Sequence, residues 1–426
     1  MAKEVNEESG SGFYPFSSAL LDWYDRVKRD LPWRGSTDPY QIWVSEIMLQ
    51  QTRVDQGIGY YRRFLARFPD VQSLAGASQQ DVLSVWQGLG YYNRALNMHK
   101  AAQIIFCERG GFFPLKADEW RKLPGVGAYT AAAVGSIAFG DPQAAVDGNV
   151  LRVISRLTCE PACISDPKAR GRLSARAQLL LCKKRPGDFN QAMMELGALV
   201  CIPGRPKCER CPVSMHCRAY LLNQTQLFPV VAPKSPPKEV SMWYWVYFNQ
   251  NGIFLRQRGN GSIWRQMWEF MPVMETQYRD LLSGAGSMNQ EGSVLSGDVR
   301  TPVFRNDTVD SVSEGGTADV GKVDDAHSLK IKPAAAGSKP INPNFRVMKE
   351  LERSVEHRLT HRLLRVSLLP VECGVGFTID SLTFVEWNEL KNYPIPVVFA
   401  RYLRLLNTVR FFGHNKLIEQ WEGSIK

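Results

Sequence analysis

Four cysteines that lie close together restrict the folding of this chain more than any other feature of its sequence. They occur in the loop CIPGRPKCERCPVSMHC with the spacing C-x6-C-x2-C-x5-C, and they are Cys201, Cys208, Cys211 and Cys217. Four thiolates so near in sequence can enclose one compact centre, and four cysteines are the ligand set of a [4Fe–4S] cluster. The alternative is a structural zinc site, which usually pairs two C-x2-C motifs across a longer gap, whereas this sequence has one.

The chain carries nine cysteines, an odd number that argues against a complete set of disulfides, and in a reducing compartment clustered cysteines more often bind metal. Five of them lack ligand spacing and are interpreted as packing residues: Cys107, Cys159, Cys163, Cys182 and Cys373. The cysteine loop also holds Arg205, Lys207 and Arg210, whose charges could meet phosphates. The net charge of +10 permits a polyanionic partner without identifying it.

The periodicity of apolar residues changes along the chain and predicts two domains. From about Ser17 to Tyr220 apolar residues recur at steps of three and four, which predicts an all-α domain. Four prolines in LFPVVAPKSPPKEV predict an extended linker. Beyond it, β-branched and aromatic runs flank Asn251-Gly252, a strong hairpin signal. With a strand expected at 361–371 and a helix in VVFARYLRLLNTV, this part is predicted to be α+β.

The predicted organisation divides the 426 residues at changes of composition. The expected segments are a disordered N-terminus (1–15), a helical domain that includes the cysteine loop (16–225, with the loop at 201–217), a Pro-rich linker (226–239), an α+β domain (240–283 and 345–426) and a low-complexity insertion (284–344). The insertion is rich in Gly, Ser, Asp and Pro, so it cannot bury enough apolar surface to offset its ordering entropy.

A glycine-rich turn and an isolated acid stand in the middle of the helical domain. The turn Leu123-Pro124-Gly125-Val126-Gly127 separates helices expected at 117–122 and 128–139. Such a reversal presents backbone N–H groups at the second helix's start, where Gly125 and Gly127 could hold a DNA phosphate. The alternative is an ordinary turn between core helices. Asp147 then opens a helix expected at 150–156, which by itself is compatible with a simple N-cap.

These features in this order resemble the DNA glycosylase superfamily that includes endonuclease III: the hairpin, the turn Gly140-Asp141-Pro142, Asp147 and the cysteine loop. The resemblance implies a helix-hairpin-helix fold and a [4Fe–4S] cluster. Bifunctional members use a lysine just after the hairpin to form a Schiff base with the sugar. Tyr129 stands at that position, and because a phenol cannot form the imine, the resemblance points to a monofunctional enzyme.

Three further blocks are similar to the MutY family of adenine DNA glycosylases: LPWRGSTDPYQIWVSEIMLQQTRV, GLGYYNRA and FNQAMMELGALVC. Those enzymes remove adenine mispaired with 8-oxoguanine or guanine. Glu46 in the first block has apolar neighbours, so burial would raise its pKa and make it a general acid, whereas an exposed Glu46 would simply be solvated. The resemblance implies that Glu46 protonates adenine N7, that Asp147 stabilises the sugar cation, and that Tyr129 and Asn149 assist.

The same resemblance implies contacts to DNA. The pocket around the extruded adenine would be formed by Trp33, Arg34, Leu49 and Gln191. Tyr91 would wedge into the duplex, and Gln51 and Thr52 would contact the opposite purine.

The second domain resembles Nudix hydrolases, which in this family read the oxidised guanine. Phe254–Val273 matches their Gly/Trp-rich turn and strand, but the catalytic Nudix box is missing from the sequence, which predicts binding without pyrophosphate hydrolysis. The family's recognition loop usually carries Phe-Ser-His, where this sequence has Leu359-Thr360-His361. Thr360 and His361 are therefore candidate lesion contacts, or else ordinary residues of a strand.

The expected partner is double-stranded DNA that contains adenine opposite 8-oxoguanine or guanine, bound by a monomer. No apolar run approaches the ~20 residues of a membrane span, and the polar N-terminus lacks a signal peptide's apolar core. We expect a cytoplasmic protein, associated with the nucleoid in a bacterium, or nuclear in a eukaryote. Two alternatives are an endonuclease III-like lyase for oxidised pyrimidines and a non-enzymatic helix-hairpin-helix protein that binds lesions or shapes DNA.

Overall fold

The computed structural model describes residues 14–233, 235–259, 263–283 and 345–408. The chain divides into two compact units, Met1–Ser235 and Pro236–Lys426, and each unit is described by itself. The predictions of a disordered N-terminus up to residue 13 and of an insertion at 284–344 concern residues outside the described part. Helix α1 begins at Tyr14, so the last two residues of the predicted N-terminal segment belong to it.

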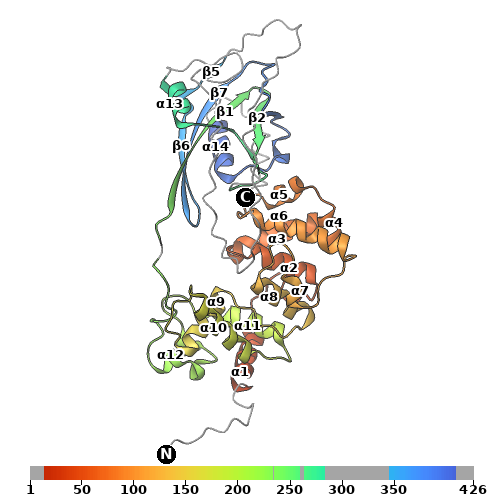
Figure 1. Ribbon diagram of the computed structural model, residues 1–426, viewed down its shortest axis with the longest axis vertical. Coiled ribbons are helices and arrows are strands. Elements are labelled where there is room, and N and C mark those ends of the chain that lie inside the picture. Colours follow the sequence, from red (N-terminus) through yellow and green to blue (C-terminus); the bar gives the residue numbers. More distant parts are fainter. Residues whose placement is uncertain (1–13, 234, 260–262, 284–344, 409–426) are drawn as a thin grey trace, which may run out of the picture. The chain divides into compact units, whose positions relative to one another are not determined.

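Helices build the first unit, and its described residues contain no strand, so the prediction of an all-α domain is confirmed for them (Figure 1). The α-helices are α1 (Tyr14–Val27), α2 (Pro39–Met48), α3 (Val54–Arg67), α4 (Val71–Ala75), α5 (Gln79–Trp86), α6 (Asn93–Gln103), α7 (Ala117–Trp120), α8 (Ala128–Phe139), α9 (Gly148–Thr158), α10 (Pro167–Leu180), α11 (Pro186–Leu199) and α12 (Arg218–Leu221). A π-helical turn, η1 (Ile104–Glu108), extends α6, and two 3₁₀ turns, η2 (Cys208–Arg210) and η3 (Ser214–His216), lie in the cysteine loop.

Local sequence signals set where several helices begin. Asp38, Asp147 and Asp166 are the N-caps of α2, α9 and α10, and each carboxylate accepts hydrogen bonds from backbone N–H groups in the first turn. Because Asp147 caps α9, this helix starts at Gly148, two residues earlier than predicted. Helix α7 instead ends at Trp120, before the predicted 122, because the Leu123 N–H bonds to the Trp120 carbonyl in a tighter turn.

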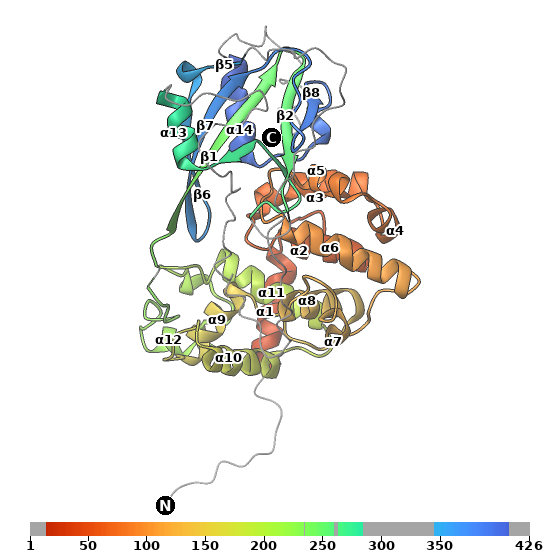
Figure 2. The same ribbon diagram turned by 45° about the horizontal axis from the view of Figure 1, so that its top comes forward.

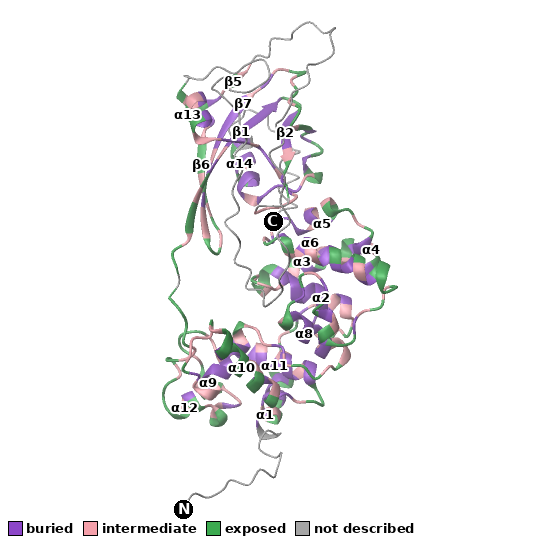
Figure 3. Cartoon of the chain, viewed as in Figure 1, coloured by how far each residue is buried: buried purple, intermediate pink, exposed green. Residues whose placement is uncertain are grey.

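The core of the first unit joins helices that are distant in sequence. One apolar cluster is shared by α1, α9, α10 and α11 and includes Leu20, Ile154 and Leu196. Helix α2 is buried from Ile42 to Met48 (Figure 3). A helix buried all round is expected to be apolar, so the acid that α2 carries is an exception that calls for a function.

The second unit contains a mixed sheet of eight strands, which confirms an α+β architecture (Figure 2). Its elements are β1 (Lys238–Asn249), β2 (Gly252–Gln257), β3 (Trp268–Glu269), β4 (Met271–Val273), α13 (Glu275–Ser283), β5 (Arg346–Val347), η4 (Lys349–Leu351), β6 (Arg353–Arg358), β7 (Arg362–Glu372), β8 (Thr383–Glu386), η5 (Leu390–Asn392) and α14 (Val397–Thr408). Strands β1 and β7 run parallel, whereas the other pairs are antiparallel. The hairpin at Asn251-Gly252, the strand at 361–371 and the final helix are confirmed.

From Met242 onward strand β1 is largely buried on both faces of the sheet, as is usual for a strand with parallel pairing. Tyr244 and Val246 belong to the apolar cluster that includes α14, whereas Trp245 and Tyr247 belong to the one that includes α13. This alternation follows the two-residue period of a strand. No helix within the described ranges is long and apolar enough to cross a membrane.

Candidate active site

Glu46 lies in a buried position where its carboxyl can hold a proton near neutral pH. Its residue is only 8% exposed, and the Tyr129 hydroxyl donates a hydrogen bond of 2.6 Å to its Oε2. Burial raises the pKa of Glu46 from 4.5 to about 7, and the charge of Asp147 adds to this, while the Tyr129 hydrogen bond and Arg34 oppose it. The alternative of a solvated surface glutamate is therefore wrong.

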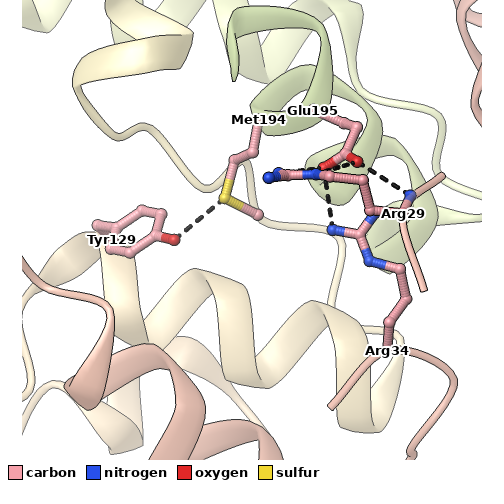
Figure 4. Close-up of polar contacts among 5 residues, drawn as sticks. All are labelled: Arg29, Arg34, Tyr129, Met194 and Glu195. Atoms are coloured by element: carbon pink, nitrogen blue, oxygen red, sulfur yellow. Dashed lines mark hydrogen bonds and ion pairs between the residues drawn. The ribbon is translucent and has the colours of Figure 1, made fainter. Parts of the chain in front are cut away.

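Tyr129 stands in the first turn of α8, directly after the glycine hairpin. Its hydroxyl also lies 3.0 Å from the Met194 sulfur on α11 (Figure 4). A phenol has one proton to donate, and the carboxylate is the stronger acceptor. Burial and the two nearby carboxyls hold the pKa of Tyr129 well above its ordinary value, so it remains a neutral donor at physiological pH.

Asp147 is both the N-cap of α9 and a member of the same group of acids. Its Oδ1 accepts a bond of 2.7 Å from the Val150 N–H, and its Oδ2 accepts one of 2.8 Å from Asn149 Nδ2. Burial raises the pKa of Asp147, although these hydrogen bonds favour its charged form. Asp147 therefore does cap α9, and this role does not exclude a second one in the chemistry of the site. When two carboxyls lie in different surroundings, one can keep its proton and act as an acid while the other stays ionised.

Arg34 is held by an acid that the sequence reasoning did not single out (Figure 4). Glu195 on α11 is 1% exposed and accepts bonds of 2.7 and 2.8 Å from Arg29 and one of 3.1 Å from Arg34 Nη2. Burial opposes ionisation, yet the two guanidinium groups hold the pKa of Glu195 below its ordinary value. The signal that could have revealed Glu195 is the same as for Glu46, an acid among apolar residues of a helix.

Two donors of Arg34 remain buried without a partner in the described structure, Nε and Nη1. A buried, unpaired donor is costly, which favours a polar ligand at this position. Its charge acts on Glu46, so it belongs to the same site. Among the other predicted pocket residues, Trp33 is buried and packs edge-on against Tyr61 with ring centroids 5.2 Å apart. Leu49 caps the C-terminus of α2, and Gln191 is half-buried on α11.

The hairpin before α8 requires glycine at its centre. Gly125 has φ +75°, and a Cβ there would lie 2.7 Å from the Cβ of Asn97. Gly127 is the N-cap of α8 and is exposed together with Ala128. The first N–H groups of a helix have no intrahelical partner, so this exposed end suits an anion.

Two loops that the resemblance assigns to DNA contact contain left-handed residues other than glycine. Gln51 has φ 58° and Tyr91 has φ 51°, and both side chains are exposed. Thr52 is half-buried beside Gln51. Such conformations persist only when their surroundings impose them, and they cluster at functional sites.

The four cysteines of the loop form one electrostatic group. Burial raises the pKa of Cys211 to about 12, and Cys201, Cys217 and Cys208 each contribute to this rise. An Arg156 N–H group donates a bond of 3.2 Å to the Cys201 sulfur. No group of three or more His, Cys, Asp or Glu residues in the described part of the chain is arranged to hold a metal ion.

The chemistry of this donor set, four cysteine thiols in one loop, fits a four-iron cluster, and it also fits a structural zinc site with four cysteine ligands.

Helix α9 connects Asp147 with the cysteine loop. Arg152 donates a bond of 2.8 Å to the Cys201 carbonyl, one of 2.9 Å to Asn149 Oδ1 and one of 2.8 Å to the Gly197 carbonyl. Asn149 in turn donates to Asp147. Gly197 permits this close approach of α11, because a Cβ there would lie 2.6 Å from the Cβ of Asn149. The sequence reasoning did not single out Arg152, although it follows Asn149 by three residues on one helix face.

Thr360 and His361 belong to the second unit. They are exposed in the turn between β6 and β7. The His361 carbonyl accepts a bond of 3.0 Å from the Lys238 N–H, and Leu359 packs against the apolar core. Leu359 therefore anchors the turn, and Thr360 and His361 lie exposed at its tip.

Part of the chain matches a model of a known protein superfamily, which indicates the class of protein to which it is similar. Residues 44–177 match the HhH-GPD superfamily of base excision DNA repair proteins, a segment that contains Glu46, the hairpin and Asp147. This segment is thus similar to helix-hairpin-helix base excision repair proteins.

Curated relatives narrow this class to one family. The chain is 39% identical to the human adenine DNA glycosylase over 313 residues, which is 61% of this chain and 57% of the human protein. It is 48% identical to the mouse adenine DNA glycosylase over 214 residues, 48% of this chain and 42% of the mouse protein. The adenine DNA glycosylase of Buchnera aphidicola from Acyrthosiphon pisum is 36% identical over 259 residues, 60% of this chain and 74% of that protein. The chain belongs to the adenine DNA glycosylase family, and it matches about half the length of the mammalian relatives.

Proposed function

We propose that this chain is a monofunctional adenine DNA glycosylase that hydrolyses the N-glycosidic bond of adenine opposite 8-oxoguanine or guanine in duplex DNA. The observation that carries the proposal is the buried Glu46 carboxyl, bonded to the Tyr129 hydroxyl and within the electrostatic influence of Asp147. Its pKa of about 7 provides an acid and its conjugate base in comparable amounts at neutral pH.

In the first step Glu46 transfers its proton to N7 of the adenine. The bond between C1′ and N9 then breaks, and its electron pair leaves with the base, which departs as neutral adenine. The Tyr129 hydroxyl stabilises the carboxylate that remains by its hydrogen bond of 2.6 Å. The acid thus removes the need to expel an adenine anion.

The sugar becomes an oxocarbenium-like cation in this step, and Asp147 provides the opposing negative charge. Its hydrogen bonds from Val150 and Asn149 fix the carboxylate and favour its ionised form. A water molecule then adds to C1′, and its proton returns to Glu46, which restores the acid. This division of labour between two carboxyls resembles that of glycosidases.

Binding of the base and of the duplex would involve the remaining groups of the first unit. The buried free donors of Arg34, together with Trp33, Leu49 and Gln191, would enclose the extruded adenine. The exposed N-terminus of α8 at the hairpin would hold a backbone phosphate, Tyr91 would fill the gap in the duplex, and Gln51 and Thr52 would contact the opposite purine.

The cysteine loop would hold a [4Fe–4S] cluster through Cys201, Cys208, Cys211 and Cys217. When bound, the cluster supplies a compact cross-link that orders a loop with little regular structure of its own. Arg205, Lys207 and Arg210 of the same loop would add positive charge next to DNA.

The second unit would act as a Nudix-like module that recognises 8-oxoguanine without hydrolytic activity, with Thr360 and His361 at the tip of the β6–β7 turn as its contacts. The protein would act as a monomer at the DNA, in the nucleoid of a bacterium or the nucleus of a eukaryote. The lyase alternative is disfavoured by Tyr129, since a phenol forms no imine.

The test is single-turnover release of adenine from a duplex with adenine opposite 8-oxoguanine, with borohydride present. We expect release without a trapped adduct by the wild type, and loss of release with retained DNA binding for Glu46→Gln and Asp147→Asn. Asparagine caps a helix as well as aspartate does, so Asp147→Asn removes the charge and keeps the cap. Glu119→Gln, at a surface glutamate paired with Arg109, is the matched control. A trapped adduct would revive the lyase, and release by Glu46→Gln at the wild-type rate would refute the proposal.

A further inference from the structure

The Arg94 guanidinium lies where two loops meet and donates hydrogen bonds to both of them. Arg94 belongs to the first turn of α6, and one of its terminal nitrogens, Nη1, bonds to three backbone carbonyls while the other, Nη2, bonds to a carbonyl and a hydroxyl. The acceptors are the oxygens of Ile47 (2.9 Å), Met48 (2.8 Å), Gln50 (2.7 Å) and Gly90 (3.0 Å) and Oγ1 of Thr52 (3.3 Å). One side chain thus joins the segment 47–52 to the segment that precedes Tyr91.

Two of these acceptors, Ile47 and Met48, are the last residues of α2, and a third, Gln50, follows its C-cap. The last carbonyls of a helix lack intrahelical partners and carry the negative end of its dipole, so a cation there stabilises the helix. Burial lowers the pKa of Arg94 to about 10, which leaves it charged at neutral pH. Arg94 therefore fixes the C-terminus of the helix that carries Glu46.

The remaining contacts surround the two strained residues. Arg94 bonds to the residues before and after Gln51, which has φ 58°, and to Gly90, directly before Tyr91, which has φ 51°. The guanidinium carbon also lies 5.5 Å from the centroid of the Tyr91 ring. The same group therefore holds both unfavourable backbone conformations and touches the exposed aromatic ring.

We propose that Arg94 is a positioning residue that couples the Tyr91 loop to the loop of Gln51 and Thr52, so that both enter the duplex as one unit. The inference rests on the proposed function and adds to it a residue that contacts neither the adenine nor the sugar. Its consequence is that separation of adenine from its partner and contact with the opposite purine occur together.

Lysine cannot replace arginine in this role. A guanidinium offers five N–H donors in a rigid plane, and the two loops use both of its terminal nitrogens. An ammonium group is one point with three donors and cannot reach acceptors on both sides at once. Arg94→Lys therefore retains the charge and removes the coupling.

The experiment compares Arg94→Lys with a matched control, Arg63→Lys. Arg63 is also half-buried, and its guanidinium carbon lies 4.5 Å from the centroid of the Tyr60 ring while Nη2 donates to the Val85 carbonyl, a residue of α5. The readouts are the fluorescence of 2-aminopurine next to the target adenine, which reports extrusion, and the single-turnover rate of adenine release. Two duplexes are used, one with 8-oxoguanine opposite adenine and one with an abasic site there.

We expect Arg94→Lys to reduce both extrusion and rate at least tenfold on the 8-oxoguanine duplex, with Arg63→Lys close to wild type. On the abasic duplex the loss should shrink to a few fold, because no opposite purine remains to be contacted and the adenine leaves the stack more easily. Arg94 acts through Tyr91, so Arg94→Lys should cost little more once Tyr91 is replaced by alanine.

Equal losses on both duplexes would overturn the coupling, because they would mean that Arg94 supports only α2 and Glu46. Wild-type extrusion by Arg94→Lys would also overturn it. If Arg94→Lys fails to fold, Arg94→Gln, which also cannot bond to both loops at once, should lower extrusion more on the 8-oxoguanine duplex than on the abasic one. Failure of the wild type to release adenine would refute the proposed function instead, so the two failures are distinguishable.

Discussion

Replacement of Glu46 by glutamine should stabilise the protein at the pH where the wild type is ionised, while it abolishes adenine release. The pKa of Glu46 is raised from 4.5 to about 7 in the folded protein, chiefly by burial. The fold therefore prefers the protonated form, and stability is lost as the pH rises between these two values. Glutamine is a neutral isostere that carries no such penalty.

The size of the effect follows from the two pKa values. A difference of about 2.5 pKa units at about 1.4 kcal/mol each gives a penalty of roughly 3 kcal/mol above pH 7 and about 1 kcal/mol at pH 5. For a domain of this size 1 kcal/mol corresponds to about 2–4 °C in Tm. We therefore expect Glu46→Gln to melt roughly 6–12 °C above the wild type at pH 8 and only slightly above it at pH 5.

The assay is thermal unfolding at pH 5 and pH 8, paired with single-turnover adenine release at both. Glu119→Gln, an exposed glutamate with 41% side-chain exposure, should show the same Tm difference from wild type at both pH values. If Glu46→Gln gains nothing between pH 5 and pH 8, Glu46 is not a destabilised buried acid, and the reasoning that makes it the proton donor is refuted.

Three further predictions concern its neighbours. Tyr129→Phe removes the hydrogen bond that lowers the pKa of Glu46, so the alkaline limb of the pH–rate profile should move upward by roughly 1–2 units; an unmoved limb would contradict this. Arg152→Gln breaks the link from Asn149 to the cysteine loop and should slow single-turnover release about tenfold at unchanged DNA affinity. Gly125→Ala should weaken DNA binding and reduce its salt dependence, which titration at several salt concentrations measures; unchanged binding would exclude the hairpin as a phosphate site.

The features that the sequence predicted correctly depend on neighbours along the chain. Helical periodicity and the Asn251-Gly252 hairpin are local patterns, and a short segment suffices to specify each of them. The position of Asp147 before a helix belongs to the same group, because an N-cap bonds to residues two or three positions ahead. The predicted end of α7 and the predicted start of α9 were each wrong by two residues, because a single hydrogen bond decides where such a helix ends or begins.

The tertiary structure decided the burial and the pKa values on which the chemistry of the site depends. The sequence left open whether Glu46 is solvated or buried, since only the packing of α8 and its neighbours against α2 excludes water and shifts the pKa. Glu195 meets Arg29 across 166 positions of the chain, and Arg94 meets Gln50 across 44. Contacts between residues so distant leave no periodic trace in the sequence. The local sequence determined which groups are present. The packing of distant segments, which excludes solvent, decided the pKa values and the contacts of those groups.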